Sequence, residues 1–409
     1  MTSRARLTAA SIGIAVGAIL APAVSPAAYA VPTDQQHQSQ QVRFAQFNAS
    51  LNRASEGQLV ADLQTGTNEQ AQNVAETIQR VNPDVVLVNE FDYVEGGAAA
   101  ELFRDNYLAV GQNGAAPADY PYYYIAPVNT GVPSGLDLDN SGTVGGGNDA
   151  YGFGEFPGQY GMVIYSKYPI QTDQVRTFQN FLWKDMPGNR MPLDYYSPAA
   201  QQALRLSSKS HWDVPIQIGK KTVHLLASHP TPPVFDGPED RNGLRNADEI
   251  RFWQDYVGSP AKSTYIYDDA GDNGGLKPGT PFVIAGDLNS DPQDGDSIHS
   301  AIQGLLDSPR VDSSVTPSSQ GAIEQSASQG GINFEHQSPA AYDTADFSEP
   351  PGNVRSDYVL PSKGLKIEDA QVFWPTSTDP LSRLTGVYPF PTSDHRLVWV
   401  DLKVPGNKQ

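Results

Sequence analysis

The chain has 409 residues, no cysteine and a formal net charge of −19. The missing cysteine excludes disulfide frameworks and thiol nucleophiles. The acidic balance argues against broad, charge-driven binding to nucleic acid, which needs a basic surface. It is compatible with a nuclease whose bound metal supplies the local positive charge.

The first 30 residues have the pattern of a secretory signal peptide. Basic residues open the chain, an apolar stretch follows, and "AYA" ends the segment at residue 30. A membrane anchor is the alternative, but the apolar stretch is short and interrupted by Pro22 and Pro26. We therefore expect a secreted monomer with no membrane-spanning segment in its mature part. Residues 31–41 are polar and predict a flexible lead-in to one domain over 42–405.

Short strand patterns recur along this domain. Each is rich in Val, Ile, Leu, Phe and Tyr and bounded by turn formers, and they fall at 42–49, 84–91, 160–167, 222–229, 281–288, 356–362 and 396–402. Apolar residues at helical spacing predict helices over 68–82 and 245–257. Many strands and few helices indicate sheets packed together with helices outside. Long irregular stretches at 111–159, 230–243 and 308–352 predict loop insertions.

Polar side chains stand where many of these strands begin or end. Each of them alone is explained as well by the needs of a turn. Together they combine carboxylate, amide and imidazole groups, the mixture that metal and phosphate chemistry uses. The set comprises Asn48, Glu90, His229, Asp287, Asn289, Asp357, Asp394 and His395.

Hydrolysis of a phosphate ester assigns a task to each kind of group. Glu90 and Asn48 suit a hard cation such as Mg²⁺, which neutralises phosphoryl charge. Asp287 suits the activation of a water molecule. Asn289, two residues further in an extended chain, faces the same side. Histidine donates to phosphoryl oxygens or exchanges protons, and a neighbouring carboxylate keeps the imidazole oriented.

The ordered motifs resemble those of the endonuclease/exonuclease/phosphatase family, and in particular an exported bacterial branch of it. They span most of residues 42–402, and "GDLN" followed by "SDH" more than 100 residues later is the most specific pairing. The motifs are "VNEF" (88–91), "GMVIYSKYPI" (161–170), "SHP" (228–230), "GDLN" (286–289), "SDYVL" (356–360) and "SDH" (393–395).

The resemblance implies an α+β fold, a four-layer α/β/β/α sandwich whose two mostly antiparallel sheets are flanked by helices. The site would lie where the strand ends of the two sheets meet. The implied metal ligands for Mg²⁺ or Mn²⁺ are Asn48, Glu90 and Asp394. The implied catalytic residues are His229 on the scissile phosphate, Asp287 on the water or leaving group with its companion Asn289, and Asp357 orienting His395. Asn89 stands where many members have Gln, so contacts behind Glu90 are expected to differ.

Other segments permit two interpretations each. Arg241 and Arg245 lie four apart, so they would either bind the substrate or pair with acidic neighbours on an exposed helix. The segment that starts with Asp137 and Asp139 resembles the beginning of a Ca²⁺-binding loop. Such a loop needs an acidic residue at position twelve, where this chain has Asn148. A Gly-rich acidic turn is the alternative there. The aromatic run at 120–124 would either stack on substrate or pack in the core.

These features predict an exported, metal-dependent phosphoesterase that uses in-line attack of an activated water. The substrate would be a nucleic acid, a phospholipid head group or a small phosphate ester. One alternative is a non-catalytic exported binding protein that retains the fold. The other is a sphingomyelinase-like lipid phosphodiesterase, which would need an exposed apolar hairpin, and residues 120–125 are the only hint of one.

Overall fold

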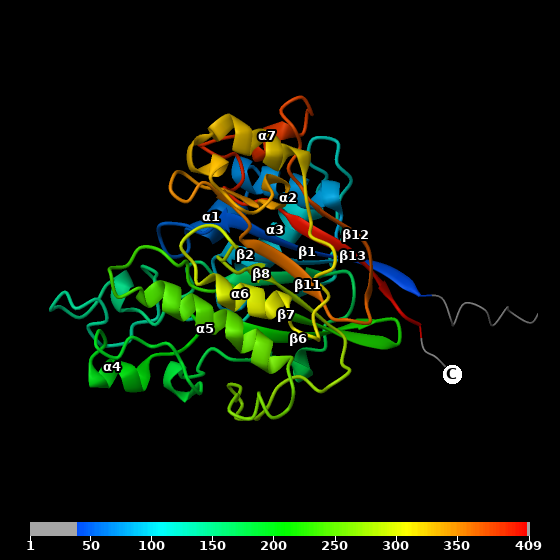
Figure 1. Ribbon diagram of the computed structural model, residues 1–409. Helices are drawn as coiled ribbons and strands as arrows, with labels where there is room; N and C mark the ends of the chain where they lie inside the picture. The colour runs from blue at the N-terminus through cyan, green and yellow to red at the C-terminus, as the bar shows by residue number, and fades with distance from the viewer. Residues whose placement is uncertain (1–38, 407–409) are drawn as a thin grey trace, which may run out of the picture.

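The computed structural model describes residues 39–406 and contains two large β-sheets packed face to face (Figure 1). The first sheet has, in spatial order, β12 (Lys366–Val372), β13 (Val398–Val404), β1 (Gln40–Leu51), β2 (Val85–Phe91), β4 (Met162–Ser166) and β3 (Tyr122–Tyr124). The second has β11 (Asp357–Pro361), β8 (Phe282–Asp287), β7 (Lys221–Ser228), β6 (His211–Ile218) and β5 (Arg176–Thr177). A small ribbon joins β9 (Ala345–Asp346) to β10 (Asn353–Val354).

Neighbouring strands in both large sheets are antiparallel except for one parallel pair in each. In the first sheet β1 runs parallel to β2, and in the second β7 runs parallel to β8. Parallel neighbours end at the same edge of their sheet. The ends of these two pairs carry Asn48, Glu90, His229 and Asp287, so the topology already groups these residues.

Helices cover the outer faces of both sheets. The first sheet is covered by α1 (Gln58–Leu63), α2 (Glu69–Val81), α3 (Ala98–Phe103) and its π-helical extension η2 (Arg104–Leu108). The second is covered by α5 (Arg241–Tyr256) and α6 (His299–Leu306), which Figure 1 shows on the opposite side. The connections contain α4 (Pro198–Ala203), α7 (Gln320–Gln329), α8 (Ser382–Thr385), η3 (Gly147–Asp149), η4 (Thr172–Gln174), η5 (Trp183–Asp185), η6 (Gly331–Phe334) and η7 (Ala340–Tyr342).

The alternation of side chains along each strand builds the layers. Phe44 of β1 faces the layer between the sheets, whereas Ala45 and Phe47 face the helices. In β8, Val283 faces the layer between the sheets and Ile284 faces α5 and α6. Because successive side chains of a strand point to opposite faces, each central strand serves two cores. The predicted four-layer sandwich is confirmed.

Local signals explain the boundaries of the predicted helices. Asn68 caps α2, with its side chain accepting from the backbone N–H of Ala71. Asn82 ends the helix in the left-handed region (φ 52°), and Pro83 prevents its continuation. The second predicted helix is also present, but α5 begins at Arg241, four residues before the expected start.

Several strands were not expected from the sequence. β6 contains Pro215, which interrupts a strand pattern, and β12 is an edge strand with mostly polar, exposed residues. Strand β1 begins at Gln40, inside the predicted lead-in. The predicted signal peptide lies outside the described residues. Within 39–406, no helix combines the length and the apolar character that a membrane crossing requires.

Buried carboxyl groups connect the insertion at 308–352 to the loop after β8. Asp291 accepts from Ser338 Oγ (2.9 Å) and from the backbone N–H of Arg355 (3.0 Å). Asp343 is 2% exposed, and its carboxyl group makes no hydrogen bond within the described part of the chain. Burial, reinforced by the charges of Asp291 and Asp294, raises the pKa of Asp343 to about 9. Asp343 therefore carries a proton at neutral pH.

We expect Asp343→Asn to stabilise the protein, and more strongly at pH 8 than at pH 4.5. Between the unfolded pKa near 4 and the folded pKa of about 9, only the unfolded chain releases this proton, so rising pH favours unfolding. The amide cannot ionise, and the expected gain at pH 8 is roughly 1–3 kcal/mol in the free energy of unfolding. Urea unfolding at both pH values measures it. A variant less stable than wild type at pH 8 would mean that Asp343 is charged and has a partner.

Candidate active site

The predicted site residues meet at one end of the sandwich, where strands of both sheets end. Asn48 lies in β1 and Glu90 in β2, whereas Asp287 ends β8 and is paired with Asp357 at the start of β11. The buried Asn48 amide donates from Nδ2 to Glu90 Oε1 (3.1 Å) and to Asp287 Oδ2 (3.0 Å). One side chain of the first sheet thus contacts a carboxylate from each sheet.

Asp287 is the centre of this arrangement. Its Oδ2 lies 3.3 Å from His229 Nε2 and 3.6 Å from His395 Nε2, and its Oδ1 accepts from the backbone N–H of Asn289 (3.0 Å). Burial alone would raise the pKa of this carboxyl, but His395 and His229 outweigh burial and hold the pKa far below its ordinary value. Asp287 is therefore ionised although it is almost fully buried.

His395 forms a buried pair with Asp357. Its Nδ1 lies 2.9 Å from Asp357 Oδ2, which also accepts from Thr344 Oγ1 (2.8 Å). Burial would lower the pKa of His395, but Asp357 and Asp287 together raise it well above the ordinary value. His395 is thus an imidazolium whose Nδ1 faces Asp357 and whose Nε2 faces Asp287.

His229 has the opposite electrostatic character. Burial and the nearby Lys209 ammonium lower the pKa of His229 to about 4, although Asp287 opposes both effects. His229 is therefore neutral at physiological pH. Its Nε2 faces Asp287, so the neutral ring carries its proton there and donates it to the carboxylate. The site combines one charged and one neutral histidine around a single carboxylate.

The predicted metal ligands Glu90 and Asn48 lie next to each other in the site. The two carboxylate oxygens of Glu90 accept from the amides of Asn48 (3.1 Å) and Asn52 (3.0 Å). Burial raises the pKa of Glu90, so a bound cation would favour its charged form. Glu90 has a left-handed backbone (φ 56°), which side chains other than Gly rarely adopt and which is typical of functional sites. Carboxylate and amide oxygens fit Mg²⁺ or Mn²⁺.

A different group of candidate ligands also lies in the site. Ligand atoms of Asp287, Asp357 and His395 lie within 4.8 Å of one another. His395 Nδ1 lies 2.9 Å from Asp357 Oδ2, and the two carboxyl groups raise the pKa of His395, so this group is suited to holding a proton on the imidazole. The geometry therefore favours proton chemistry for this group. Asp394, predicted as a metal ligand, lies next to His395, and its charge acts on both His395 and Glu90.

Helix α5 holds the loops that follow β7 and β8. Asn246 Nδ2 donates to the carbonyls of Thr231 (2.8 Å) and Leu288 (2.9 Å). Glu249 accepts from the backbone N–H groups of Ser208 and Thr231, both at 2.6 Å. These bonds position the chain on either side of the catalytic loops, and Asn246 and Glu249 are both buried.

Asn289 belongs to the same framework. Its backbone is left-handed (φ 51°), and its side-chain amide donates to the carbonyl of Pro230 (3.1 Å), beside His229. Asn289 therefore links the loop after β8 to the loop after β7. This contact uses Nδ2 and leaves Oδ1 without a hydrogen bond inside the described chain, so the companion role predicted for the amide stays a prediction.

Asn89 forms the layer behind Glu90. Its Oδ1 accepts from Gln46 Nε2 (2.9 Å) in the same sheet and from the backbone N–H of Asp287 (3.3 Å) in the other sheet. Its Nδ2 donates to the carbonyl of Ser228 (3.5 Å) at the end of β7. The shorter amide thus connects three strands directly behind the site.

The two arginines expected to bind substrate have other contacts. Arg245 is buried, and its guanidinium donates to backbone carbonyls of Leu206 (2.8 Å) and Tyr151 (2.6 Å), and also to those of Arg205 and Ser207. Its donors hold the chain in place, and substrate binding by Arg245 stays a prediction. Arg241 pairs with Glu239 and lies over the ring of Tyr195, as the surface-pairing alternative expected.

The acidic loop at 137–149 brings its carboxylates together. Ligand atoms of Asp137, Asp139 and Asp149 lie within 4.8 Å of one another. However, Asp149 already accepts from the backbone N–H groups of Leu138 (2.7 Å) and Gly145 (2.7 Å), as expected for an acidic turn. Ca²⁺ binding at this loop stays a prediction.

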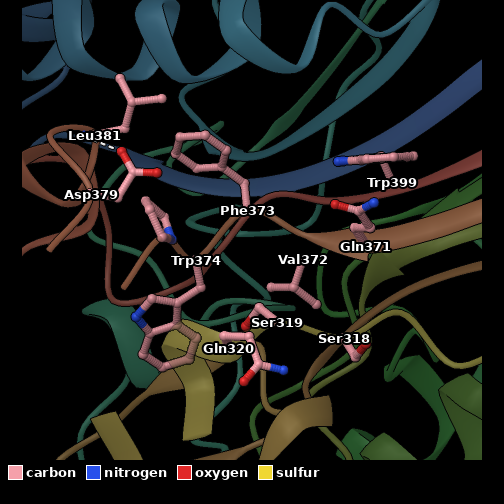
Figure 2. A pocket seen from close by; sticks show the side chains of 11 residues that line it. Ser318, Ser319, Gln320, Gln371, Val372, Phe373, Trp374, Asp379, Leu381 and Trp399 are labelled. Atoms are coloured by element: carbon pink, nitrogen blue, oxygen red, sulfur yellow. Dashed lines mark hydrogen bonds between the residues drawn. The ribbon is translucent and has the colours of Figure 1, made fainter. Parts of the chain in front are cut away.

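A separate cavity of about 270 Å³ lies away from these residues (Figure 2). Figure 2 shows side chains around it from the segment before α7, from the end of β12 with the residues after it, and from Trp399 of β13. No predicted catalytic or metal-binding residue lines it. This cavity is therefore not the candidate active site.

Several contributing residues were not singled out from the sequence. Asn52 lies four positions after Asn48 and was available as a second amide, but the other residues lie in loops or on a helix face without a motif. The missed residues are Asn52, Lys209, Asn246, Glu249 and Thr344.

We expect Asp357→Asn to lower the pKa of His395 toward its ordinary value, by about 1–3 pH units, because the nearest negative charge is lost. Histidine NMR titration in the presence of a chelator measures this, with the His395 signal assigned from its loss in His395→Ala. Asp401→Asn, which removes the partner of Arg43 in β13, is the matched control and should leave the titration unchanged. An unchanged titration in Asp357→Asn would contradict the pairing.

Comparisons with known proteins agree with the fold. A family model described as the endonuclease/exonuclease/phosphatase family matches residues 24–395. A protein of that family from Beutenbergia cavernae DSM 12333 has 17% identity over 90% of this chain and 72% of its own, with a TM-score of 0.48. One from Bacteroides thetaiotaomicron has 12% identity over 90% and 99%, with a TM-score of 0.46. Sphingomyelinase C from Streptomyces griseocarneus has 14% identity over 88% and 99%, with a TM-score of 0.45.

A search of curated proteins finds no match to the sequence. The TM-scores of these structural likenesses are all below 0.5, so the family rests on the family model alone. The family match covers most of the chain and includes the "GDLN" and "SDH" motifs. The chain belongs to the endonuclease/exonuclease/phosphatase family, whose fold is that of phosphoester hydrolases.

Proposed function

We propose that the chain is an exported, Mg²⁺-dependent phosphoesterase that hydrolyses its substrate by in-line attack of water. The observation that supports this most is the buried, ionised Asp287 with an amide from the first sheet and two histidines around it. A structural carboxylate in this position would need only neutral donors. A charged imidazole beside it, held by a second carboxylate, is an arrangement for moving protons.

Asp287 orients the water and takes its proton as the new P–O bond forms. Its strongly lowered pKa makes it a weak base, so its main contribution is to position the water rather than to bind the proton tightly. The His395 imidazolium donates to a phosphoryl oxygen or to the leaving oxygen, and Asp357 keeps it charged. Neutral His229 donates a hydrogen bond from Nε2 without adding charge.

Asn48, Glu90 and Asp394 would hold the cation, and Mn²⁺ would suit the same oxygen ligands. When bound, the cation neutralises phosphoryl charge and makes the phosphorus more susceptible to attack. The carboxylate of Glu90 has two amide donors that keep its position defined. Export is proposed on the signal-peptide pattern of residues 1–30 alone.

The lipid phosphodiesterase alternative lacks the expected hairpin at 120–125. Tyr120 is buried, and Tyr122–Tyr124 form the edge strand β3 of the first sheet. The two most exposed large apolar side chains of the described residues are instead Phe235 and Tyr388, on separate loops. A nuclease or a phosphatase is compatible with the same catalytic groups, so the substrate has to come from an assay.

Residues 31–409, tested with plasmid DNA, RNA, sphingomyelin and simple phosphate mono- and diesters, should hydrolyse at least one of these when Mg²⁺ is present. His395→Ala should lower kcat about 100- to 10,000-fold, because a positioned acid–base group contributes that much. His299→Ala is the matched control, since His299 begins α6 outside the site. Product release is measured with and without chelator.

Equal turnover by His395→Ala would contradict the mechanism. Hydrolysis that resists the chelator would contradict the metal requirement. If none of the esters is hydrolysed although the folded protein binds phosphate, the non-catalytic binding protein becomes the better description.

A further inference from the structure

A buried lysine outside the predicted set lies at the edge of the active site. Lys209 lies two residues before β6, and the pairing of His211 with Ser228 places it across from the end of β7, close to His229. Its backbone carbonyl accepts from the N–H of Asn129 (2.9 Å). The position of Lys209 is therefore defined by the sheet and by a neighbouring loop.

The residue before it strengthens this placement. Ser208 donates its backbone N–H to Glu249 of α5 (2.6 Å), and its hydroxyl donates to the carbonyl of His229 (3.3 Å). Glu249 also accepts from Thr231, two residues after His229. One buried carboxylate thus holds the segment that carries Lys209 and the segment that carries His229 at a set spacing.

The ammonium of Lys209 has no partner in the described chain. The residue is 6% exposed, yet its Nζ makes no hydrogen bond and no ion pair within 4.0 Å. The carboxylates whose charges act on it are those of Glu90, Glu249 and Asp287, all beyond that distance. Lys209 Nζ is not one of the buried side-chain atoms left without a partner in the described chain, so it keeps contact with solvent. Its three N–H donors are therefore available to a ligand.

Two other buried cations of the described chain donate to the protein itself, although Arg396 Nε lacks a partner and the charge of Arg355 contacts only the ring of Tyr358. Arg245 donates to four backbone carbonyls, and Arg396 pairs with Asp346 and donates to two carbonyls. Lys209 has no carboxylate within 4.0 Å, and the charges of Glu90, Glu249 and Asp287 act on it from further away. The bond from Ser208 to the carbonyl of His229 places the backbone of Lys209 beside the predicted catalytic residues.

We propose that Lys209 is a substrate-binding residue whose ammonium contacts a non-bridging oxygen of the phosphoryl group. The inference rests on the proposed function and names the side chain that binds the phosphate charge on the β6 side of the site. Burial lowers the pKa of Lys209, while the surrounding carboxylates oppose that effect, and a phosphate would oppose it further. In the same position, Lys209 also keeps His229 neutral.

The test measures binding of inorganic phosphate by calorimetry, with Mg²⁺ and with chelator, for wild type, Lys209→Met and Lys209→Arg. Because a hydrogen bond to a charged group is lost, Lys209→Met should weaken phosphate binding about 10- to 100-fold in both conditions. Lys209→Arg should restore part of it. Lys221→Met, at the other end of the β6–β7 hairpin, is the matched control and should bind like wild type. Lys209→Met should not lower the unfolding temperature, because the Lys209 side chain makes no hydrogen bond or ion pair in the described chain that would be lost.

Phosphate binding by Lys209→Met within twofold of wild type, or a lower unfolding temperature with unchanged binding, would overturn the inference and indicate a structural lysine. The outcome is separable from that of the proposed function. Ester hydrolysis that Lys209→Met leaves unchanged in KM and kcat would refute the role of Lys209 alone. Lys209-dependent phosphate binding by a protein that hydrolyses no ester would refute the proposed function alone.

Discussion

The arrangement of the site depends on one buried negative charge, the carboxylate of Asp287. A carboxylate cannot be buried in a sandwich without several donors, because its desolvation is far more costly than any single hydrogen bond repays. The donors come from both sheets and from the loops after them: Asn48 from β1, His229 after β7 and His395 before β13. The site therefore forms only when the two sheets are packed together at this end of the sandwich.

Two groups of surrounding residues keep these donors in place, one by hydrogen bonds to the backbone and the other by an ionic contact. On the side of the second sheet, α5 uses Asn246 and Glu249 to bind backbone groups of three loops, so the loops are held without touching the reacting groups. On the side of His395, the contact is ionic, through Asp357 and Thr344. The protein as a whole is strongly acidic, so the positive charge of the site is local and comes from a few buried groups.

Much of the fold, and the residues that the candidate site brings together, could be predicted because strands and strand ends leave clear local patterns. Asp287 and His395 follow or precede apolar runs and were found for that reason. Lys209 and Glu249 were missed because their importance arises only when β6 and α5 are brought beside β7, and neither has a spacing that signals it. The surroundings of Arg245 could not be predicted for a related reason: sequence gives its charge, but only the fold shows that backbone carbonyls engage it.

The amide of Asn89 has a consequence for the sandwich itself. Apolar side chains between two sheets tolerate several relative offsets, because burial is nearly the same in each and lacks direction. Asn89 binds Gln46 in its own sheet while reaching the backbones of Asp287 and Ser228 in the other, and those bonds are satisfied at one offset only. Asn89 therefore fixes the position of one sheet relative to the other. The site residues of the first sheet, Asn48 and Glu90, are therefore held opposite Asp287 of the second sheet at one fixed offset. A purely apolar interface would not favour this offset over others.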